Sequence, residues 1–215
     1  TMVVHDYKYG EFGGLKFSGR CGASNQYRNT RILEHAGLVL GSRAPQMGTN
    51  GVRFHNLTFE HYALGLSVGN MLTSGSTAEN IFDNVGVSQS HIGVLFAGWN
   101  TLDNIFRQLN VAETDIGVYS DTGYSNQFYN GAGGNNRWTF SLRTCCEWIV
   151  DGWREEYGAN TIGWMEYGSA ASDTRVIVRG SNLVDSLNPH RSFPVAIQAL
   201  NNATRELTDA RKAYG

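Results

Sequence analysis

Proline, cysteine and long apolar runs are scarce in this chain, and their scarcity narrows the possible folds and functions. Only 3 prolines and 3 cysteines occur among its 215 residues. Cys21 and the adjacent pair Cys145 and Cys146 have neither the spacing of metal ligands nor the pattern of a disulfide framework. We therefore expect core thiols and no metal site. Phosphate-binding loops and nucleophile-elbow motifs are missing too, so no cofactor is predicted.

Blocks of one charge are also missing. Seventeen basic and 19 acidic residues give a net charge of −2, and without a basic run we expect no nucleic-acid partner. No apolar stretch approaches the roughly 20 residues that cross a bilayer, so no membrane span is predicted. The first residues lack the charged and apolar regions of a signal peptide, although a cleaved one would leave no trace.

What the chain does contain is a repeat. The triplet Asn-Ile-Phe at residues 80–82 returns 24 residues later at 104–106, and the apolar residues that follow it match at the same shift. A period of about 20 to 30 residues is typical of solenoids, in which stacked units bury one continuous core. Backward and forward comparison shows five units. Their corresponding positions are Leu64, Ile92, Ile116, Phe140 and Ile162.

The apolar spacing within each unit indicates strands. Leu57 and Phe59 stand two apart, as do Val85 and Val87, which is the spacing of a strand with one buried face. A helix would show spacings of three and four. Stacked identical units give parallel sheets without hairpins, so we predict an all-β fold, a single-stranded parallel β-helix. Leu57, Val85 and Leu109 should then share one buried column, and Ile92 and Ile116 another.

The domain organisation follows from where the repeat is clear. Regular units cover about residues 51–180, and we expect one β-helix domain over 1–188. The segment 189–215 differs in character and is predicted to be a C-terminal extension or cap, with a short helix over 200–213. Because solenoids need polar caps and this chain starts in mid-pattern, we expect a fragment of a longer protein.

Asparagine recurs at the turns of successive units. Side chains one period apart stack about 4.8 Å from each other, so we expect a structural ladder of amides. Two such series are Asn80, Asn104 and Asn126, and Asn56, Asn84 and Gln108.

The stacked units with Asn-rich turns and the recurring Asn-x-Phe…Ile-Gly-Val pattern resemble the pectin-lyase-like right-handed β-helix superfamily. The resemblance covers about residues 51–179. Residues 152–161 (GWREEYGANT) resemble a unit of the phage tailspike and polysaccharide-degrading branch. The resemblance implies a right-handed helix, a bacterial surface or cell-wall glycan as ligand, an extracellular or virion-surface location and a homotrimer. The catalytic motifs of pectate lyases and polygalacturonases are missing, so the resemblance assigns no catalytic residue.

Acids, an arginine and tryptophans gather between Trp148 and Glu166. If Ile162 takes the register of Ile116, Glu155 takes the inward register of Leu109, where it is either a buried acid of raised pKa or turned outward by an inserted residue. The candidate catalytic residues are Glu155, Glu156 and Asp151. Arg154, Trp153, Trp164 and Tyr119 are the candidate substrate-binding residues. The alternative is that the tryptophans fill a wide unit and Glu155 accepts structural hydrogen bonds.

Two further pairs lie one period apart. Glu79 and Asp103 could form the two carboxyls that glycoside hydrolysis needs, and His91 beside Asp115 could act as a general base. Both pairs lie in turns, where exposed acids and surface ion pairs are the more ordinary outcome.

Three functions remain open from the sequence. The first is a polysaccharide-degrading enzyme, either a glycoside hydrolase or a polysaccharide lyase. The second is a non-catalytic carbohydrate-binding or receptor-recognition module, and the third is a structural shaft. Outward positions of Leu95 and Tyr119 would form an exposed apolar stripe, from which we expect a homo-oligomer.

Overall fold

The structure is a computed structural model. Almost all of its regular secondary structure consists of β-strands. It describes residues 1–5, 7–20, 35–41, 48–70, 75–98, 100–120, 122–144, 146–168, 174–185, 195–199, 203–208 and 211–213. Among these, no helix is long and apolar enough to cross a membrane.

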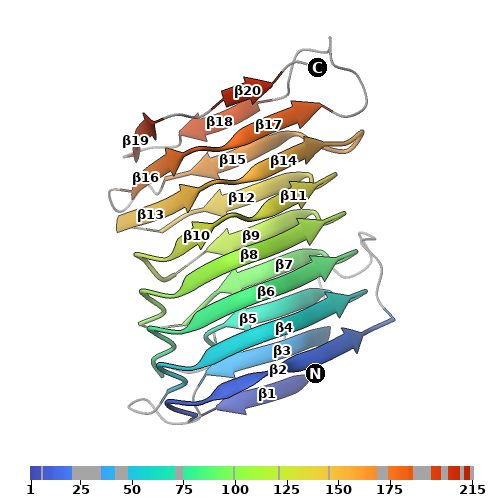
Figure 1. The fold of residues 1–215 in the computed structure, drawn as a ribbon, viewed down its shortest axis with the longest axis vertical. Helices are drawn as coiled ribbons and strands as arrows, with labels where there is room; N and C mark the ends of the chain where they lie inside the picture. Colours follow the sequence, from blue (N-terminus) through green and yellow to red (C-terminus); the bar gives the residue numbers. More distant parts are fainter. Residues whose placement is uncertain are drawn as a thin grey trace.

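The strands form two parallel sheets, and successive stretches of the chain alternate between them (Figure 1). The 8-stranded sheet consists of β1 (Met2–His5), β3 (Ala36–Gly41), β5 (Leu64–Val68), β7 (Ile92–Phe96), β9 (Ile116–Ser120), β12 (Trp138–Leu142), β15 (Gly163–Tyr167) and β18 (Val195–Ala199). The 12-stranded sheet consists of β2 (Glu11–Ser18), β4 (Arg53–Glu60), β6 (Ile81–Ser88), β8 (Ile105–Ala112), β10 (Gln127–Tyr129), β11 (Ala132–Gly134), β13 (Cys146–Asp151), β14 (Arg154–Tyr157), β16 (Thr174–Arg179), β17 (Asn182–Asp185), β19 (Ala203–Thr208) and β20 (Arg211–Ala213).

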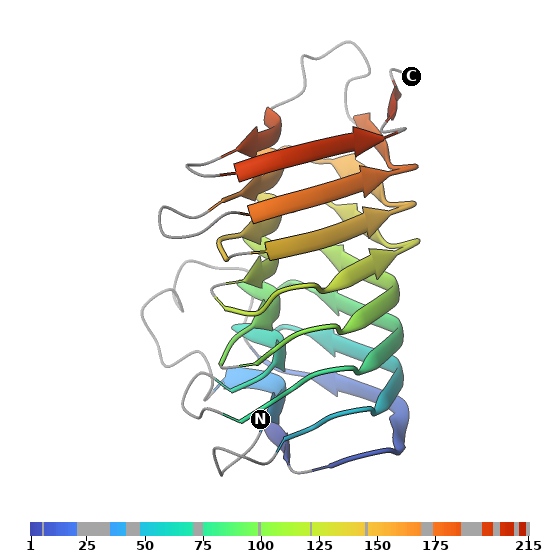
Figure 2. The same cartoon turned by 90° about the vertical axis from the view of Figure 1, so that its left-hand side faces the viewer.

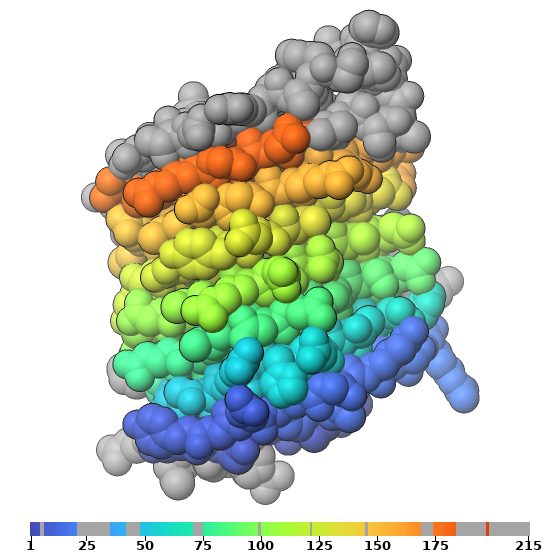
Figure 3. All heavy atoms as spheres, in the orientation of Figure 1, coloured from blue at the N-terminus to red at the C-terminus, as the bar shows by residue number. Residues whose placement is uncertain are grey.

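This arrangement is all-β and parallel, and it is compatible with a parallel β-helix. The predicted column is confirmed: Leu57 pairs with Val85 and Val85 with Leu109, and all three are buried. Ile92 pairs with Ile116 in the other sheet, where Ile92 is buried and Ile116 only partly buried. One unit of the sequence repeat therefore contributes to both sheets, and the units follow one another as bands across the molecule (Figure 3).

Each long strand of the 12-stranded sheet bends at one residue with a left-handed backbone (Figure 2). Phe54 and Leu57 are both buried although they stand three apart, because the bend at Asn56 adds one outward residue between them. In later units the bend separates two short strands, such as β10 and β11. The bend residues are Gly14, Asn56, Asn84, Gln108, Asn130, Gly152 and Gly180, with φ from 51° to 72°.

The core is built from stacked aromatic rings. Phe54, Phe82 and Phe106 lie ring on ring, with centroids 4.9 and 4.3 Å apart and near-parallel planes. Phe128 continues the stack at 5.4 Å, and the buried Trp148 lies beyond it. Register and ring stacking thus align the units.

Three local predictions are wrong. The first is the register of Ile116, Phe140 and Ile162. Ile116 pairs with Trp138, whereas Phe140 pairs with Val118. Trp138 pairs in turn with Gly163, not Ile162, because the loop after Tyr157 contains extra residues, and Ile162 is 38% exposed. The second concerns residues 122–137, whose irregular pattern predicts an enlarged turn; the structure has the strands β10 and β11 within this range.

The short C-terminal helix is the third wrong prediction. Strands β19 and β20 occupy 203–208 and 211–213 and pair with β16 and β17. Pairing with the preceding unit outweighs the local spacing of Leu200, Ala203 and Leu207, since strand formation depends on context more than on local propensity.

The apolar stripe expected from Leu95 and Tyr119 is not exposed. Leu95 is 2% exposed and belongs to a second, smaller apolar cluster, against which the partly buried Tyr119 packs. The observation from which a homo-oligomer was inferred therefore does not hold for these residues.

Candidate functional site

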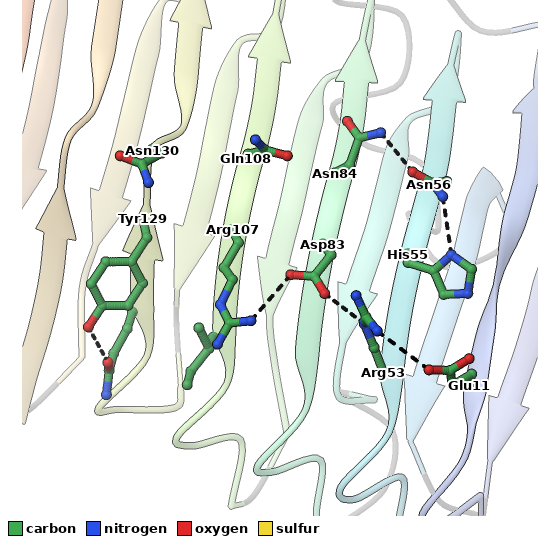
Figure 4. A pocket seen from close by; sticks show the side chains of 12 residues that line it. Glu11, Arg53, His55, Asn56, Asp83, Asn84, Arg107, Gln108, Tyr129 and Asn130 are labelled. Atoms are coloured by element: carbon green, nitrogen blue, oxygen red, sulfur yellow. Dashed lines mark hydrogen bonds and ion pairs between the residues drawn. The ribbon is translucent and has the colours of Figure 1, made fainter.

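A groove of about 1050 Å³ lies across the outer face of the 12-stranded sheet (Figure 4). It crosses five consecutive strands, β2, β4, β6, β8 and β10, along their first halves and their bends. All of its lining residues except Ile105 carry a polar group: Glu11, Arg53, His55, Asn56, Asp83, Asn84, Ile105, Arg107, Gln108, Gln127, Tyr129 and Asn130.

Charges of alternating sign cross the groove from strand to strand. Arg53 Nε donates to Asp83 Oδ2 at 2.8 Å, and its Nη1 lies 3.6 Å from Glu11 Oε1. Asp83 raises the pKa of the Arg53 guanidinium, through their hydrogen bond first and then their attraction. On the other side Arg107 Nη1 lies 3.8 Å from Asp83 Oδ1. Arg107 thus makes an ion pair without a short hydrogen bond, and its side chain is 55% exposed.

A column of side-chain amides lies beside these charges, at the bends. Asn84 Nδ2 donates to Asn56 Oδ1 at 2.8 Å, and Asn56 Nδ2 lies 3.2 Å from His55 Nδ1. Among the described residues, the amide groups of Gln108 and Asn130 make no hydrogen bond. Figure 4 shows both projecting into the groove.

An aromatic side chain stands at the β10 end of the groove. Tyr129 is next to Arg107 in register, and its hydroxyl donates to Gln127 Oε1 at 2.7 Å. This bond holds the phenol ring in place beside the guanidinium. The groove therefore offers donors, acceptors and a planar apolar face on neighbouring strands.

Glu155, the leading catalytic candidate, is not in a groove but inside the molecule. It is fully buried, and its register is that of Gly133 and Val111, not of Leu109. Thr139 Oγ1 donates to Oε1 at 2.8 Å, and Trp153 Nε1 donates to Oε2 at 2.9 Å. The inward, hydrogen-bonded alternative is thus confirmed.

The surroundings of Glu155 explain both its position and its pKa. An added Cβ at Gly133 would lie 2.1 Å from Oε2, so the carboxyl fills the space that this glycine leaves in the column. Gly131 leaves the corresponding space for the ring of Trp153. Burial raises the pKa of Glu155 to about 8, against the opposing effect of its two hydrogen bonds. Glu155 is an acid held neutral by enclosure, out of reach of a polymer.

The other predicted site residues do not converge. Trp153 and Trp164 are buried in the core and present no face to solvent for a sugar to stack on. Arg154 and Glu156 pair with each other on the outer face, where both line a second, smaller hollow of about 350 Å³. Asp151 follows Tyr129 in register, one strand beyond the large groove. Tyr119 lies on β9, in the other sheet.

Two other predicted groups of polar residues have structural partners, whereas no hydrogen bond or ion pair joins the described side chains of Glu79 and Asp103. His91 Nδ1 and Asp115 Oδ2 are 2.6 Å apart and form a partly buried hydrogen bond. The predicted ladder of Asn80, Asn104 and Asn126 is confirmed, with Nδ2-to-Oδ1 bonds of 3.0 and 2.9 Å. No cluster of His, Cys, Asp and Glu suited to a metal ion occurs among the described residues.

The cysteines are not all core thiols. Cys146 is disulfide-bonded and lies on the exposed first position of β13. Cys21 and Cys145 lie outside the described residues. The count and spacing of three cysteines gave no sign of this bond.

Compared with known protein families, with curated proteins and with solved structures, the chain gives no significant match.

Sequence patterns missed the groove because it has no motif. Its residues are outward-facing polar side chains, which any exposed strand has. The signal that could have located it is the spacing of buried residues, three apart and then two, in Phe82, Val85 and Val87. Such spacing marks a bend, and the side chains of successive bends must stack.

Proposed function

We propose that the protein binds a glycan along the groove of the 12-stranded sheet. The observation that carries the proposal is the lining, in which amides, guanidinium groups and carboxylates recur on consecutive strands and end at Tyr129. Sugar hydroxyls both donate and accept hydrogen bonds, and amides supply both functions in one planar group. The ring of Tyr129 offers an apolar face for a pyranose ring.

The charge balance argues against other polymeric ligands. Arg53 and Arg107 stand against Glu11 and Asp83 in the groove, whereas binding to a nucleic-acid backbone depends on a surplus of cations. Ile105 and Tyr129 are the only large apolar side chains in the lining. An apolar peptide or lipid would find few of the hydrophobic contacts that usually dominate such sites.

The same geometry favours binding over degradation. Glycoside hydrolysis uses two carboxyls that face the scissile bond, one of them kept protonated. Glu155 is kept protonated but is enclosed, and Glu156 and Asp151 lie in different places on the outer face. A non-catalytic recognition module is therefore the proposal, with polysaccharide cleavage as the hypothesis that the same assay tests.

The fold supports a wider context for this function. Two parallel sheets with a buried amide ladder are in keeping with a right-handed β-helix of the pectin-lyase-like type, as in phage tailspikes. We extend the proposal to an extracellular or virion-surface location, which the disulfide at Cys146 supports because such bonds persist in oxidising surroundings. A homotrimer would follow from the tailspike resemblance alone.

Binding to immobilised capsular, O-antigen and plant cell-wall polysaccharides tests the proposal. We expect the parent protein to bind at least one of them, and an Arg107→Ala/Tyr129→Ala double variant to lose at least ~10-fold in affinity. Arg175→Ala, which removes an exposed ion pair with Glu147 outside the groove, is the matched control. Equal binding by all three proteins would place the site elsewhere. Reducing ends or unsaturated products released from the bound polysaccharide would show that the protein also cleaves it.

A further inference from the structure

The amide column of the groove has a definite length. Asn56, Asn84, Gln108 and Asn130 occupy the bends of four consecutive strands, with φ between 51° and 58°. Glycine takes the same position in the unit before them, at Gly14, and in the two units after them. The column is therefore four amides long, with no side chain at the bend on either side.

The fold does not require these amides. Glycine adopts the left-handed backbone without strain, and the sheet continues through Gly14 and Gly152 with unbroken pairing on both sides. The left-handed backbone conformation favours glycine at every bend, and asparagine nearly as strongly. It does not explain why the amides occupy these four bends and not the bends before and after them. All four amides line the groove, which extends one strand further only at its β2 end, through Glu11.

The spacing of the column suits a repeating ligand. Neighbouring strands lie about 4.8 Å apart, and a pyranose ring advances an extended glycan by a similar distance. A glycan lying across the strands would thus meet the same amide, in the same orientation, at each successive sugar. A glycan lying along one strand would meet a single amide.

We infer that the groove holds a linear glycan perpendicular to the strands, with one sugar per unit and four sugar subsites. This inference rests on the proposed function and adds to it the orientation, the length and the unbranched character of the ligand. Gln108 and Asn130, whose amides have no partner among the described residues, form the two subsites nearest Arg107 and Tyr129. Asn56 and Asn84, already hydrogen-bonded to each other, form the two weaker ones.

The test uses oligosaccharides of two to eight sugars, prepared by partial hydrolysis of a polysaccharide that the parent protein binds, and titration calorimetry. A hydrogen bond contributes about 0.5–1.5 kcal/mol net, or about 2- to 10-fold in affinity. We expect affinity to rise by that factor with each sugar up to the fourth and to change less than ~2-fold from the fifth to the eighth. Saturation at two sugars, or a steady rise through eight, would overturn the inference.

Glycine substitutions provide the matched variants. Gln108→Gly and Asn130→Gly keep the left-handed backbone and remove only the amide. Each should weaken binding of the four-sugar ligand ~3- to 10-fold and leave two-sugar ligands of the other subsites less affected. Gln89→Gly is the control, because Gln89 has the same backbone conformation (φ 51°) outside the groove.

The outcomes separate the two ideas. If none of the panel polysaccharides binds, or if the affinity is unchanged in the Arg107→Ala/Tyr129→Ala double variant, both the proposed function and the inference are wrong. If binding depends on the groove but the length series saturates elsewhere, or the two glycine variants bind like Gln89→Gly, only the inference fails.

Discussion

Two columns of side-chain amides run across this molecule, one buried and one exposed, and their contacts differ sharply. In the buried column, each Oδ1 of Asn104 and Asn126 accepts from both the Nδ2 and the backbone N–H of the preceding asparagine. Each Nδ2 also donates to a threonine carbonyl. In the exposed column only Asn84 and Asn56 are joined. Amides of the same type and period thus serve the fold where they are buried and remain available to a ligand where they are exposed.

The largest expected effect comes from breaking the buried column. Asn104→Ala leaves the backbone N–H of Asn80 and the carbonyl of Thr77 without their partners in the interior, and it removes one of the two hydrogen bonds of the Asn80 amide, which keeps its bond to the carbonyl of Thr49. An unsatisfied buried group costs about 1–3 kcal/mol, so we expect a loss of about 3–5 kcal/mol in the free energy of unfolding. Urea titration followed by circular dichroism measures it. A loss below ~1 kcal/mol would mean that water or a local shift replaces the ladder.

The next largest expected effect is a pH dependence of the free energy of unfolding, which arises from the buried carboxyl group of Glu155. Its folded-state pKa of about 8 lies above the value of 4.5 for an exposed glutamate. Between these values the folded protein keeps a proton that the unfolded chain has lost, so stability falls as pH rises from about 4.5 and levels off above about 8. At up to ~1.4 kcal/mol per pH unit, the fall amounts to a few kcal/mol across the window.

Glu155→Gln is the matched variant for this measurement. The amide has the size of the protonated carboxyl but does not titrate, so the variant should lose most of the decline between pH 5 and pH 8 while remaining folded at pH 5. The measurement is the free energy of unfolding of both proteins at four pH values between pH 5 and pH 8. A parallel decline in both proteins would assign the pH dependence to other groups.

A smaller effect is expected at the glycine that makes room for Glu155. Gly133→Ala places a methyl group against Oε2, and overpacking of this kind costs about 1–3 kcal/mol. In a Glu155→Ala background the same change should cost less than ~0.5 kcal/mol, because the carboxyl it meets is gone. A double-mutant cycle measures this coupling. Additive effects would show that Gly133 is required by the backbone and not by Glu155.

The buried features of the fold were the more predictable ones from the sequence. The column of Leu57, Val85 and Leu109 and the ladder of Asn80, Asn104 and Asn126 were predictable, because period and burial fix them together. The inward position of Glu155 was predicted from a register that was wrong by two residues, and it survived because a shift of two keeps a strand residue on the same face. Its complete enclosure could not be predicted, since its partners Thr139 and Trp153 meet it only in the folded unit.

The exposed features were less predictable for a physical reason. A solvated strand position tolerates nearly any polar side chain, so Arg53, Asp83 and Arg107 carry no pattern that separates a groove from an ordinary surface. The bend that aligns the exposed amides breaks the two-residue alternation used to find strands. Local pattern also failed at residues 203–208 and 211–213, where pairing with β16 and β17 decides the structure.

The smallest expected effect on the free energy of unfolding comes from removing an amide of the exposed column. Asn84→Gly removes an amide from the same kind of position that Gly14 and Gly152 occupy, with φ of 54° at Asn84. Glycine relieves the strain of a left-handed side chain but adds freedom to the unfolded chain, and the exposed bond to Asn56 contributes little. We therefore expect a change within about 0.5 kcal/mol in the free energy of unfolding, measured by the same urea titration as Asn104→Ala. A loss comparable to that of Asn104→Ala would show that the exposed amides hold the bends in place, and their availability to a ligand would no longer follow.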